Sequence, residues 1–355
     1  MFALCSHAFP VTLQNFKKDT KLYMTIRLSL ATLALFTGVT AQALPLRTEF
    51  LRENEFVQDN KDNVQYINFG NFDQWITRNI EESGIIGGET KQVYAIGPTS
   101  VINGRTPYLG TGGSPWATSN VMAHVSGIYK TNVSVFKQVR PGHGYCAKLY
   151  THLEQVKVLG IVNIKVLAAG SIYLGQMMEP ITSSSNPMKY LNCGVKFSRK
   201  PKAIMFDYAT KLIPGDRIRQ TGFGGAKSVA GRDLADCVIY LQKRWEDAKG
   251  NVYAKRIGTM IHYFTQTTSW MNNQEFTINY GNITTQPFYK SYMGLTSQFY
   301  MKNSKGKMVP IKEIEWGTAD DTPTHLIIKF DSSNGGAYTG TVGNTLWIDN
   351  VRLVY

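Results

Sequence analysis

The stretch that decides the fold is the last ten residues, Leu346–Tyr355 (LWIDNVRLVY). Apolar and polar residues alternate on either side of Asp349, which is the pattern of a strand with one buried face. Under strict alternation, however, the apolar residues from Val351 onward face away from those before Asp349. One extra residue restores a single apolar face, so the sequence predicts a β-bulge at Asp349–Asn350. Bulges often lie beside ligand sites, which makes Asp349 a candidate site residue; the alternative is that it ends a pair of strands and bonds locally.

The rest of the chain from Tyr66 onward is also typical of strands. Runs of four to eight residues rich in Val, Ile, Tyr, Phe and Thr are separated by Gly, Pro, Asn and Asp, which predicts an all-β sandwich or barrel. The clearest segments are the buried strand Leu326–Phe330, the alternating segment Phe276–Tyr280, and a hairpin of Cys237–Trp245 and Val252–Ile257 with Gly250 at positive φ in its turn. The best helical window, Trp75–Glu82, makes only about two turns.

The N-terminus has the features of an export signal. Residues 28–39 (LSLATLALFTGV) form a short apolar run behind the basic Arg27, and Ala41–Ala43 supplies an A-x-A cleavage site. We therefore expect a leader and signal peptide over 1–43, a polar lead-in that is extended or a short helix over 44–65, and the folded domain over 66–355. Export predicts a secreted, periplasmic or cell-surface protein with no transmembrane span in the mature chain; Met1 and Met24 are both possible starts.

The charge balance argues against a nucleic-acid partner. The chain has 38 Lys and Arg residues and 25 Asp and Glu residues, and without the leader the excess falls to ten positive charges. These charges are scattered, whereas nucleic-acid proteins usually concentrate them in a stripe. The alternative to a solvated basic surface is attraction to acidic glycans or to a negatively charged envelope. Three Cys residues remain after the leader, so they cannot all pair with one another.

Four stretches resemble the putative carbohydrate metabolism domain, a family of exported proteins from glycan-degrading bacteria. They occur in the family's order and are Gly70–Trp75, Ser114–Asn120, Gly194–Pro201 and, most specifically, Phe330–Leu353 (FDSSNGGAYTGTVGNTLWIDNVRL). The opening stretch departs from the family, with Asp73 in place of Glu and Phe69 in place of Asn. The resemblance implies a jelly-roll β-sandwich, galactose-binding-domain-like and elaborated with long loops, that is similar to carbohydrate-binding modules.

The same resemblance implies a possible metal site but no required cofactor. Similar sandwiches often hold a structural calcium between the first and last strands, and Asp73 and Asp349 are the matching carboxylates here. Two carboxylates with backbone carbonyls could supply the oxygen ligands that calcium prefers. The alternative is that both are solvated loop acids.

Two polar stretches that contain Trp are candidates for carbohydrate binding. A sugar needs a flat aromatic platform for its apolar face and amides or acids for its hydroxyls. Trp116 with Asn120, and Trp270 with Asn272, supply both within a few residues, although burial as a packing residue would explain either Trp equally well.

No catalytic residues are assigned. Glycoside hydrolysis needs two placed carboxylates, and none of the acidic residues lies in an acid/base motif. The preferred hypothesis is therefore a non-catalytic carbohydrate-binding or glycan-handling protein whose partner is a glycan or polysaccharide. A glycoside hydrolase on the same sandwich and a structural or adhesive surface protein are the alternatives, and the oligomeric state is open.

Overall fold

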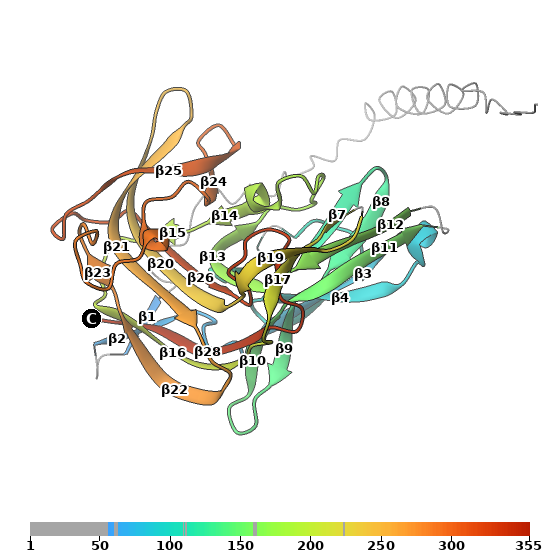
Figure 1. Ribbon diagram of the computed structural model, residues 1–355, viewed down its shortest axis with the longest axis horizontal. Helices are drawn as coiled ribbons and strands as arrows, with labels where there is room; N and C mark the ends of the chain where they lie inside the picture. Colours follow the sequence, from blue (N-terminus) through green and yellow to red (C-terminus); the bar gives the residue numbers. More distant parts are fainter. Residues whose placement is uncertain (1–55, 60–62, 109, 111, 159–161, 223) are drawn as a thin grey trace, which may run out of the picture. The chain divides into compact units, whose positions relative to one another are not determined.

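The computed structural model describes residues 56–59, 63–108, 110, 112–158, 162–222 and 224–355 (Figure 1). The predicted signal peptide and its cleavage site lie outside these residues, as does most of the predicted lead-in. The described chain is all-β, as predicted, with three short 3-10 helices: η2 (Gly84–Ile86), η3 (Pro187–Tyr190) and η4 (Ser291–Met293). No helix among the described residues is both long and apolar enough to cross a bilayer.

The first large sheet has seven strands, with β28 at its centre. One edge of β28 pairs with β16, which in turn pairs with β22; the other edge pairs with β2 and β10 at its two ends. The strands are β1 (Phe56–Asp59), β2 (Val64–Ile67), β9 (Val135–Val139), β10 (Tyr145–Tyr150), β16 (Ala203–Lys211), β22 (Thr268–Thr277) and β28 (Thr345–Val354).

Strand β28 contains the predicted β-bulge. Opposite β16, Asp349 pairs with Asp207 and Arg352 pairs with Met205, so β28 has one residue more than its partner between these two pairs. Within the bulge, Asn350 has a φ of 54°, a left-handed conformation that Asn tolerates better than most residues. As a result, the apolar residues on both sides of the bulge are buried in the same core.

The second large sheet has ten strands and closes on itself. They are β6 (Trp116–Thr118), β13 (Ser171–Met177), β14 (Leu191–Cys193), β15 (Val195–Lys196), β20 (Ala235–Glu246), β21 (Val252–Phe264), β23 (Asn279–Tyr280), β24 (Tyr300–Lys302), β25 (Met308–Trp316) and β26 (His325–Asp331). Closure comes from pairing of β13 with β26. The predicted hairpin is β20 and β21, with Gly250 at a φ of 89° in the turn.

The main core lies between the two large sheets, which face each other as the layers of a sandwich (Figure 1). One layer contributes residues such as Ile204 and Leu353, and the other contributes residues such as Ile239 and Ile328, all fully buried. A second core fills the inside of the closed ten-stranded sheet, around Tyr173 and Tyr240. The predicted β-sandwich class is therefore confirmed.

Four smaller sheets flank these layers. Their strands are β3 (Trp75–Glu81), β4 (Thr90–Ile96), β5 (Ser100–Asn103), β7 (Val121–Val125), β8 (Ile128–Asn132), β11 (His152–Val158), β12 (Val162–Ala168), β17 (Asp216–Arg219), β18 (Thr221–Gly222), β19 (Lys227–Arg232) and β27 (Thr339–Gly340). The segment Trp75–Glu82, the best helical window in the sequence, is not a helix, because Trp75–Glu81 forms β3. Trp75 at its start is buried, and from Ile76 the buried residues Ile76, Arg78 and Ile80 repeat every second position, which is the period of a strand.

The segment predicted as one alternating strand at Phe276–Tyr280 is in fact two strands. Phe276, the last residue but one of β22, pairs with Ile204 of β16, whereas Tyr280 pairs with Gly258 of β21 in the other large sheet. The chain crosses from one layer to the other at the buried Ile278. This crossing leaves β22 and part of β21 as neighbouring sheet edges, and a cavity lies between them.

Candidate functional site

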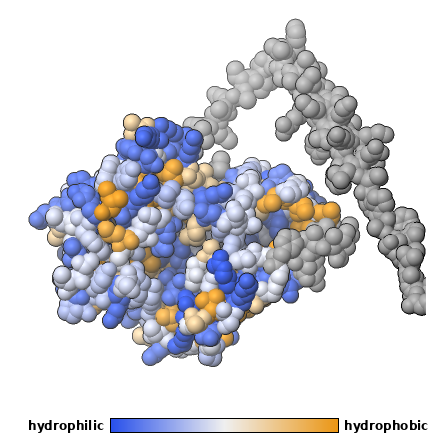
Figure 2. Space-filling model, turned by 45° about the horizontal axis from the view of Figure 1, so that its top comes forward, coloured by the Kyte–Doolittle hydropathy of each residue, from blue (hydrophilic) through white to orange (hydrophobic). Residues whose placement is uncertain are grey.

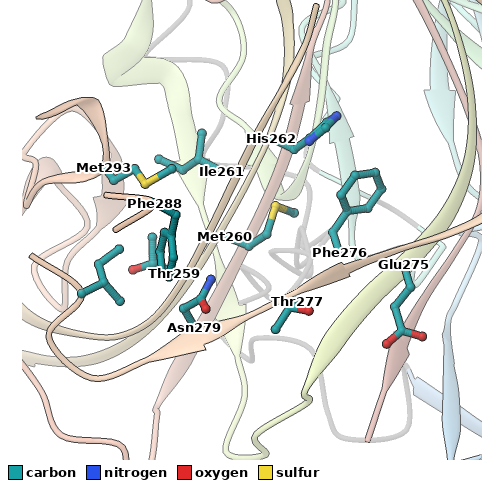
Figure 3. Close-up of a pocket in the computed structure, with 11 residues that line it drawn as sticks. Thr259, Met260, Ile261, His262, Glu275, Phe276, Thr277, Asn279, Phe288 and Met293 are labelled. Atoms are coloured by element: carbon teal, nitrogen blue, oxygen red, sulfur yellow. The ribbon is translucent and has the colours of Figure 1, made fainter. Parts of the chain in front are cut away.

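The candidate site is a cavity of about 330 Å³ between β21 and β22 (Figure 3). Within the part of the chain that the structure describes, strand β22 pairs only with β16, so its other edge is free. Strand β21 pairs with β25 and β23 only as far as Thr259, so Met260–Phe264 pairs with β20 alone. The loop between β23 and η4 forms a third wall. The cavity therefore lies at the open edge of the sandwich.

The walls of the cavity are mostly apolar. Phe276 is fixed from behind, because its ring stacks on Phe206 of the core with centroids 4.8 Å apart. Phe288 lines the cavity from the loop and is 42% exposed. Aliphatic and thioether groups complete the apolar lining: Met260, Ile261, Ile283 and Met293. The cavity thus offers two aromatic rings, one rigid and one accessible to solvent.

Polar side chains without hydrogen-bond partners line the cavity on different sides (Figure 3). His262, Thr277 and Asn279 line the cavity, and their side chains make no hydrogen bond with other described residues. Burial lowers the pKa of His262, so its imidazole is neutral at neutral pH and offers one donor and one acceptor. Its ring is held against Phe276, with centroids 4.5 Å apart. Three polar groups are therefore available to a ligand.

Only one carboxylate lines the cavity. Glu275 is exposed, and in Figure 3 its carboxylate points away from Met260 and Asn279. Among the described residues no group of three or more His, Cys, Asp and Glu could hold a metal ion. The three described Cys residues are buried free thiols, and burial raises the pKa of Cys146 and Cys193 to about 12, which makes them unreactive. The cavity has the chemistry of a binding site for a neutral polar ligand.

Trp116 and Asn120, predicted to bind sugar, are core residues. Trp116 is 4% exposed, its Nε1 donates to the Asn68 carbonyl, and its ring packs edge-on against Phe72. The Asn120 amide donates to the Tyr94 and Val135 carbonyls and accepts from the backbone N–H groups of Ser134 and Val135. This disagrees with the expected exposed platform: Trp116 packs the core and Asn120 ties together two chain segments.

Trp270, Asn272 and Asp349 are brought together by a residue that the sequence analysis did not single out. Arg140, in the turn after β9, donates from Nη1 to Asp207 at 2.8 Å and to Asp349 at 2.6 Å. Its Nη2 donates to the Asn272 amide oxygen at 2.6 Å, and its guanidinium lies 4.0 Å from the Trp270 ring centroid. Arg140, Asp207 and Asp349 are all buried. We call these five residues the Arg140 cluster.

The two carboxyls of the Arg140 cluster differ in pKa. Burial raises the pKa of Asp349 to about 6, against the lowering effect of Arg140. Burial also acts to raise the pKa of Asp207, but hydrogen bonds from the Asn273 backbone, Asn350 and Arg140 outweigh it and hold the pKa below its usual value. Arg140 thus supplies the positive charge that these acids need.

The residues present do not fit the predicted calcium site. Asp349 already faces the guanidinium of Arg140, whereas Asp73 is exposed and accepts hydrogen bonds from the Tyr145 backbone and the Asn71 amide. A calcium ion beside Asp349 would lie against a buried cation. Calcium binding through Asp73 and Asp349 stays a prediction, without support from this arrangement.

The sequence did not predict the cavity, because none of the residues that line it lies in a distinctive motif. The alternation of Phe276, Ile278 and Tyr280 predicted a strand, but it did not predict that the chain crosses between the two layers there and so creates the cavity. His262 was one of several dispersed histidines, and Phe288 lies in a loop with no motif. Only the unpaired edges of β21 and β22, which are properties of the folded chain, bring these residues to one cavity.

Comparison with known proteins gives one family and two similar structures. The family model described as "Putative carbohydrate metabolism domain" matches residues 99–354, which is more than two-thirds of the chain. This confirms the resemblance found in the sequence; the opening stretch Gly70–Trp75 lies outside the matched residues. No curated protein sequence matches.

The chain is similar to two solved structures, both described as putative glycoside hydrolases. The one from Bacteroides thetaiotaomicron is 18% identical and has a TM-score of 0.40, with 76% of each chain covered. The one from Bacteroides vulgatus is 16% identical and has a TM-score of 0.38, with 62% of this chain and 77% of that chain covered.

Proposed function

Because the chain belongs to the putative carbohydrate metabolism domain family, we propose that it is an exported protein that binds carbohydrate in the cavity between β21 and β22. The observation that carries this proposal is the meeting of two aromatic rings with three unpartnered polar side chains in one cavity. Ligand cavities combine apolar walls with a few polar groups that fix orientation. Sugars have both an apolar C–H face and hydroxyl groups, so they match such a lining.

The cavity size fits one or two sugar units. Its volume of about 330 Å³ is at the lower end of the range for small-ligand sites, roughly 300–1,000 Å³. A sugar ring would stack on Phe288 or Phe276, with its hydroxyls toward His262, Thr277 and Asn279. The open mouth would let the rest of a glycan chain extend into solvent. The ligand is therefore a terminal or branch sugar of a larger glycan.

The arrangement supports binding rather than hydrolysis. A glycosidase needs two carboxylates that flank the scissile bond, and Glu275 is the only acid among the described residues that line the cavity. Asp207 and Asp349 are close enough to be such a pair, since each binds the same nitrogen of Arg140. Both are buried beneath Arg140 and Trp270, however, and a substrate would have to displace this cation to reach them.

The proposal is tested by screening Leu44–Tyr355 on a glycan array, followed by calorimetry with the best ligand. Phe288→Ala and Asn279→Ala should each weaken binding about tenfold, because they remove an exposed ring and a free amide. Tyr66→Ala is the matched control, since Tyr66 is also 42% exposed and lies on β2. Equal affinity of Phe288→Ala and the parent chain, or no binding to any glycan, would contradict the proposal.

A further inference from the structure

A row of three side chains crosses the ten-stranded sheet outside the cavity. Trp245 of β20 pairs with Tyr253 of β21, and Tyr253 pairs with Lys312 of β25. Residues paired in this way project from the same face, and neighbouring strands lie about 4.8 Å apart. The row is therefore about 10 Å long and runs across the strands. We call Trp245, Tyr253, Lys312 and the adjacent Ile314 the Trp245 platform.

The two aromatic rings of the Trp245 platform lie side by side; Trp245 is exposed and Tyr253 is half-buried. The Trp245 and Tyr253 rings are 6.0 Å apart and inclined by only 26°. Trp245 is 40% exposed and Ile314 is 55% exposed. Most of the surface shown in Figure 2 is hydrophilic, with a few compact hydrophobic patches. One exposed apolar side chain is ordinary, but Trp245 and Ile314 lie on the same surface beside Tyr253, and a contiguous apolar patch marks an interaction surface.

The platform exists because β20 continues beyond the sandwich core. Ile239 and Leu241 bury their side chains between the two large sheets, and Lys243 and Trp245 follow at the same two-residue spacing. Lys243 and Trp245 are exposed, so no second layer covers the face there. Packing therefore does not require a Trp at position 245.

The charges around the platform favour an anionic partner. The Lys312 ammonium lies 5.6 Å from the Tyr253 ring centroid and forms no ion pair with the described residues. Lys243 and Lys255 project beside the aromatic rings and pair only with Asp321 and Glu315 at partly exposed positions. Three lysines thus face two acids on this surface, and the chain without its predicted leader has an excess of ten positive charges.

We propose that the Trp245 platform binds an acidic polysaccharide chain, at a site separate from the cavity. The apolar faces of successive sugar rings would lie on Trp245 and Tyr253, which can stack without requiring a particular sugar. A carboxylate or sulfate on the chain would pair with Lys312. The row is long enough to contact more than one sugar ring, so it suits an extended chain, whereas the cavity suits a terminal unit.

Affinity electrophoresis of Leu44–Tyr355 in gels containing polygalacturonate or dextran tests this inference. Polygalacturonate should retard the parent chain, and uncharged dextran should not. Trp245→Ala should weaken retardation at least fivefold without changing the net charge, with Trp245→Phe in between. Lys312→Gln should weaken it several-fold and reduce its dependence on salt. Tyr66→Ala controls for loss of an exposed ring elsewhere.

The outcomes separate this inference from the cavity proposal. Retardation by polygalacturonate that is unchanged in Trp245→Ala would overturn the platform, as would equal retardation by dextran. If Phe288→Ala loses glycan binding while Trp245→Ala behaves like the parent chain, the cavity proposal stands and the platform fails. Loss in Trp245→Ala alone, with native circular dichroism, would support the platform as an independent site.

Discussion

Replacing Arg140 with Met should be far more destabilising than the loss of an ordinary surface ion pair. Arg140, Asp207 and Asp349 are exposed by 3%, 3% and 1%, and the two ion pairs are 2.8 and 2.6 Å long. Met keeps most of the side-chain volume but leaves two carboxylates buried without a cation. Removing one partner of a buried pair typically costs about 3–5 kcal/mol, whereas an exposed pair contributes about 0–1 kcal/mol.

The effect of Arg140→Met should also depend on pH in a defined direction. Without the guanidinium, both carboxyls avoid the cost of burial by taking up a proton, which is easier at low pH. The free energy of unfolding should therefore fall by about 3–5 kcal/mol at pH 8 and by clearly less at pH 5. Urea unfolding followed by tryptophan fluorescence measures this, since urea is uncharged and does not screen the ion pairs.

Two controls make the Arg140 result decisive. Lys91→Met removes the cation of the exposed pair with Glu89 and should cost less than about 1 kcal/mol at either pH. A double-mutant cycle with Asp349→Asn should show a coupling energy of at least about 1 kcal/mol, because the two residues are in direct contact. A loss of less than 1 kcal/mol in Arg140→Met, or an equal loss at both pH values, would refute the view that this buried cation neutralises the two acids.

Three further predictions concern stability. Deleting Asn350 removes the bulge and turns one half of β28 away from the core, so this variant should not show a native circular dichroism spectrum. The control Asn350→Ala keeps the number of residues in β28. It should fold, with a free energy of unfolding in urea that is lower by about 1–3 kcal/mol. Asn120→Ala should lower the free energy of unfolding by about 3 kcal/mol or more, because four backbone groups each lose a hydrogen bond; a loss under 1 kcal/mol would contradict the view that Asn120 ties the two segments together. Since burial raises the pKa of Asp349 from 3.8 to about 6, its carboxyl stabilises the fold most below pH 4 and loses this effect as the pH rises through 6; the slope of unfolding free energy against pH in this window should become smaller in Asp349→Asn, and an unchanged slope would rule out this assignment.

Local sequence features predicted several elements of the fold correctly. The bulge in β28 could be predicted from the spacing of its apolar residues, because successive side chains along a strand point to opposite faces of the sheet. The β20–β21 hairpin could be read from its turn, where Gly250 supplies a positive φ. Both features depend on neighbouring residues only. The window Trp75–Glu82 was too short for its helical spacing to be distinguished from a strand with a buried polar residue, Arg78.

The site residues depend on contacts between distant parts of the chain, which sequence patterns do not reveal. Arg140 contacts Asp207 and Asp349 across separations of 67 and 209 residues. Trp116 lies in a stretch of small and polar residues that is typical of an exposed loop, yet β6 pairs with β13 and buries it. The polar sequence around a Trp therefore did not predict whether its ring would be exposed. Whether the Trp116 ring is exposed depends on its position in the sheet, which the local sequence does not specify.

The most direct test of the central claim is a methionine-methyl NMR titration of Leu44–Tyr355 with the saccharide that binds best on the array. Met260 and Met293 both line the cavity, from β21 and from η4, whereas Met122 lies in a separate small core and serves as an internal reference. Carbohydrate binding in the cavity predicts saturable shifts of the Met260 and Met293 methyl signals, lost in Phe288→Ala, with the Met122 signal unchanged. Saturable binding that leaves the Met260 and Met293 signals in place would contradict the claim that this cavity is the carbohydrate site.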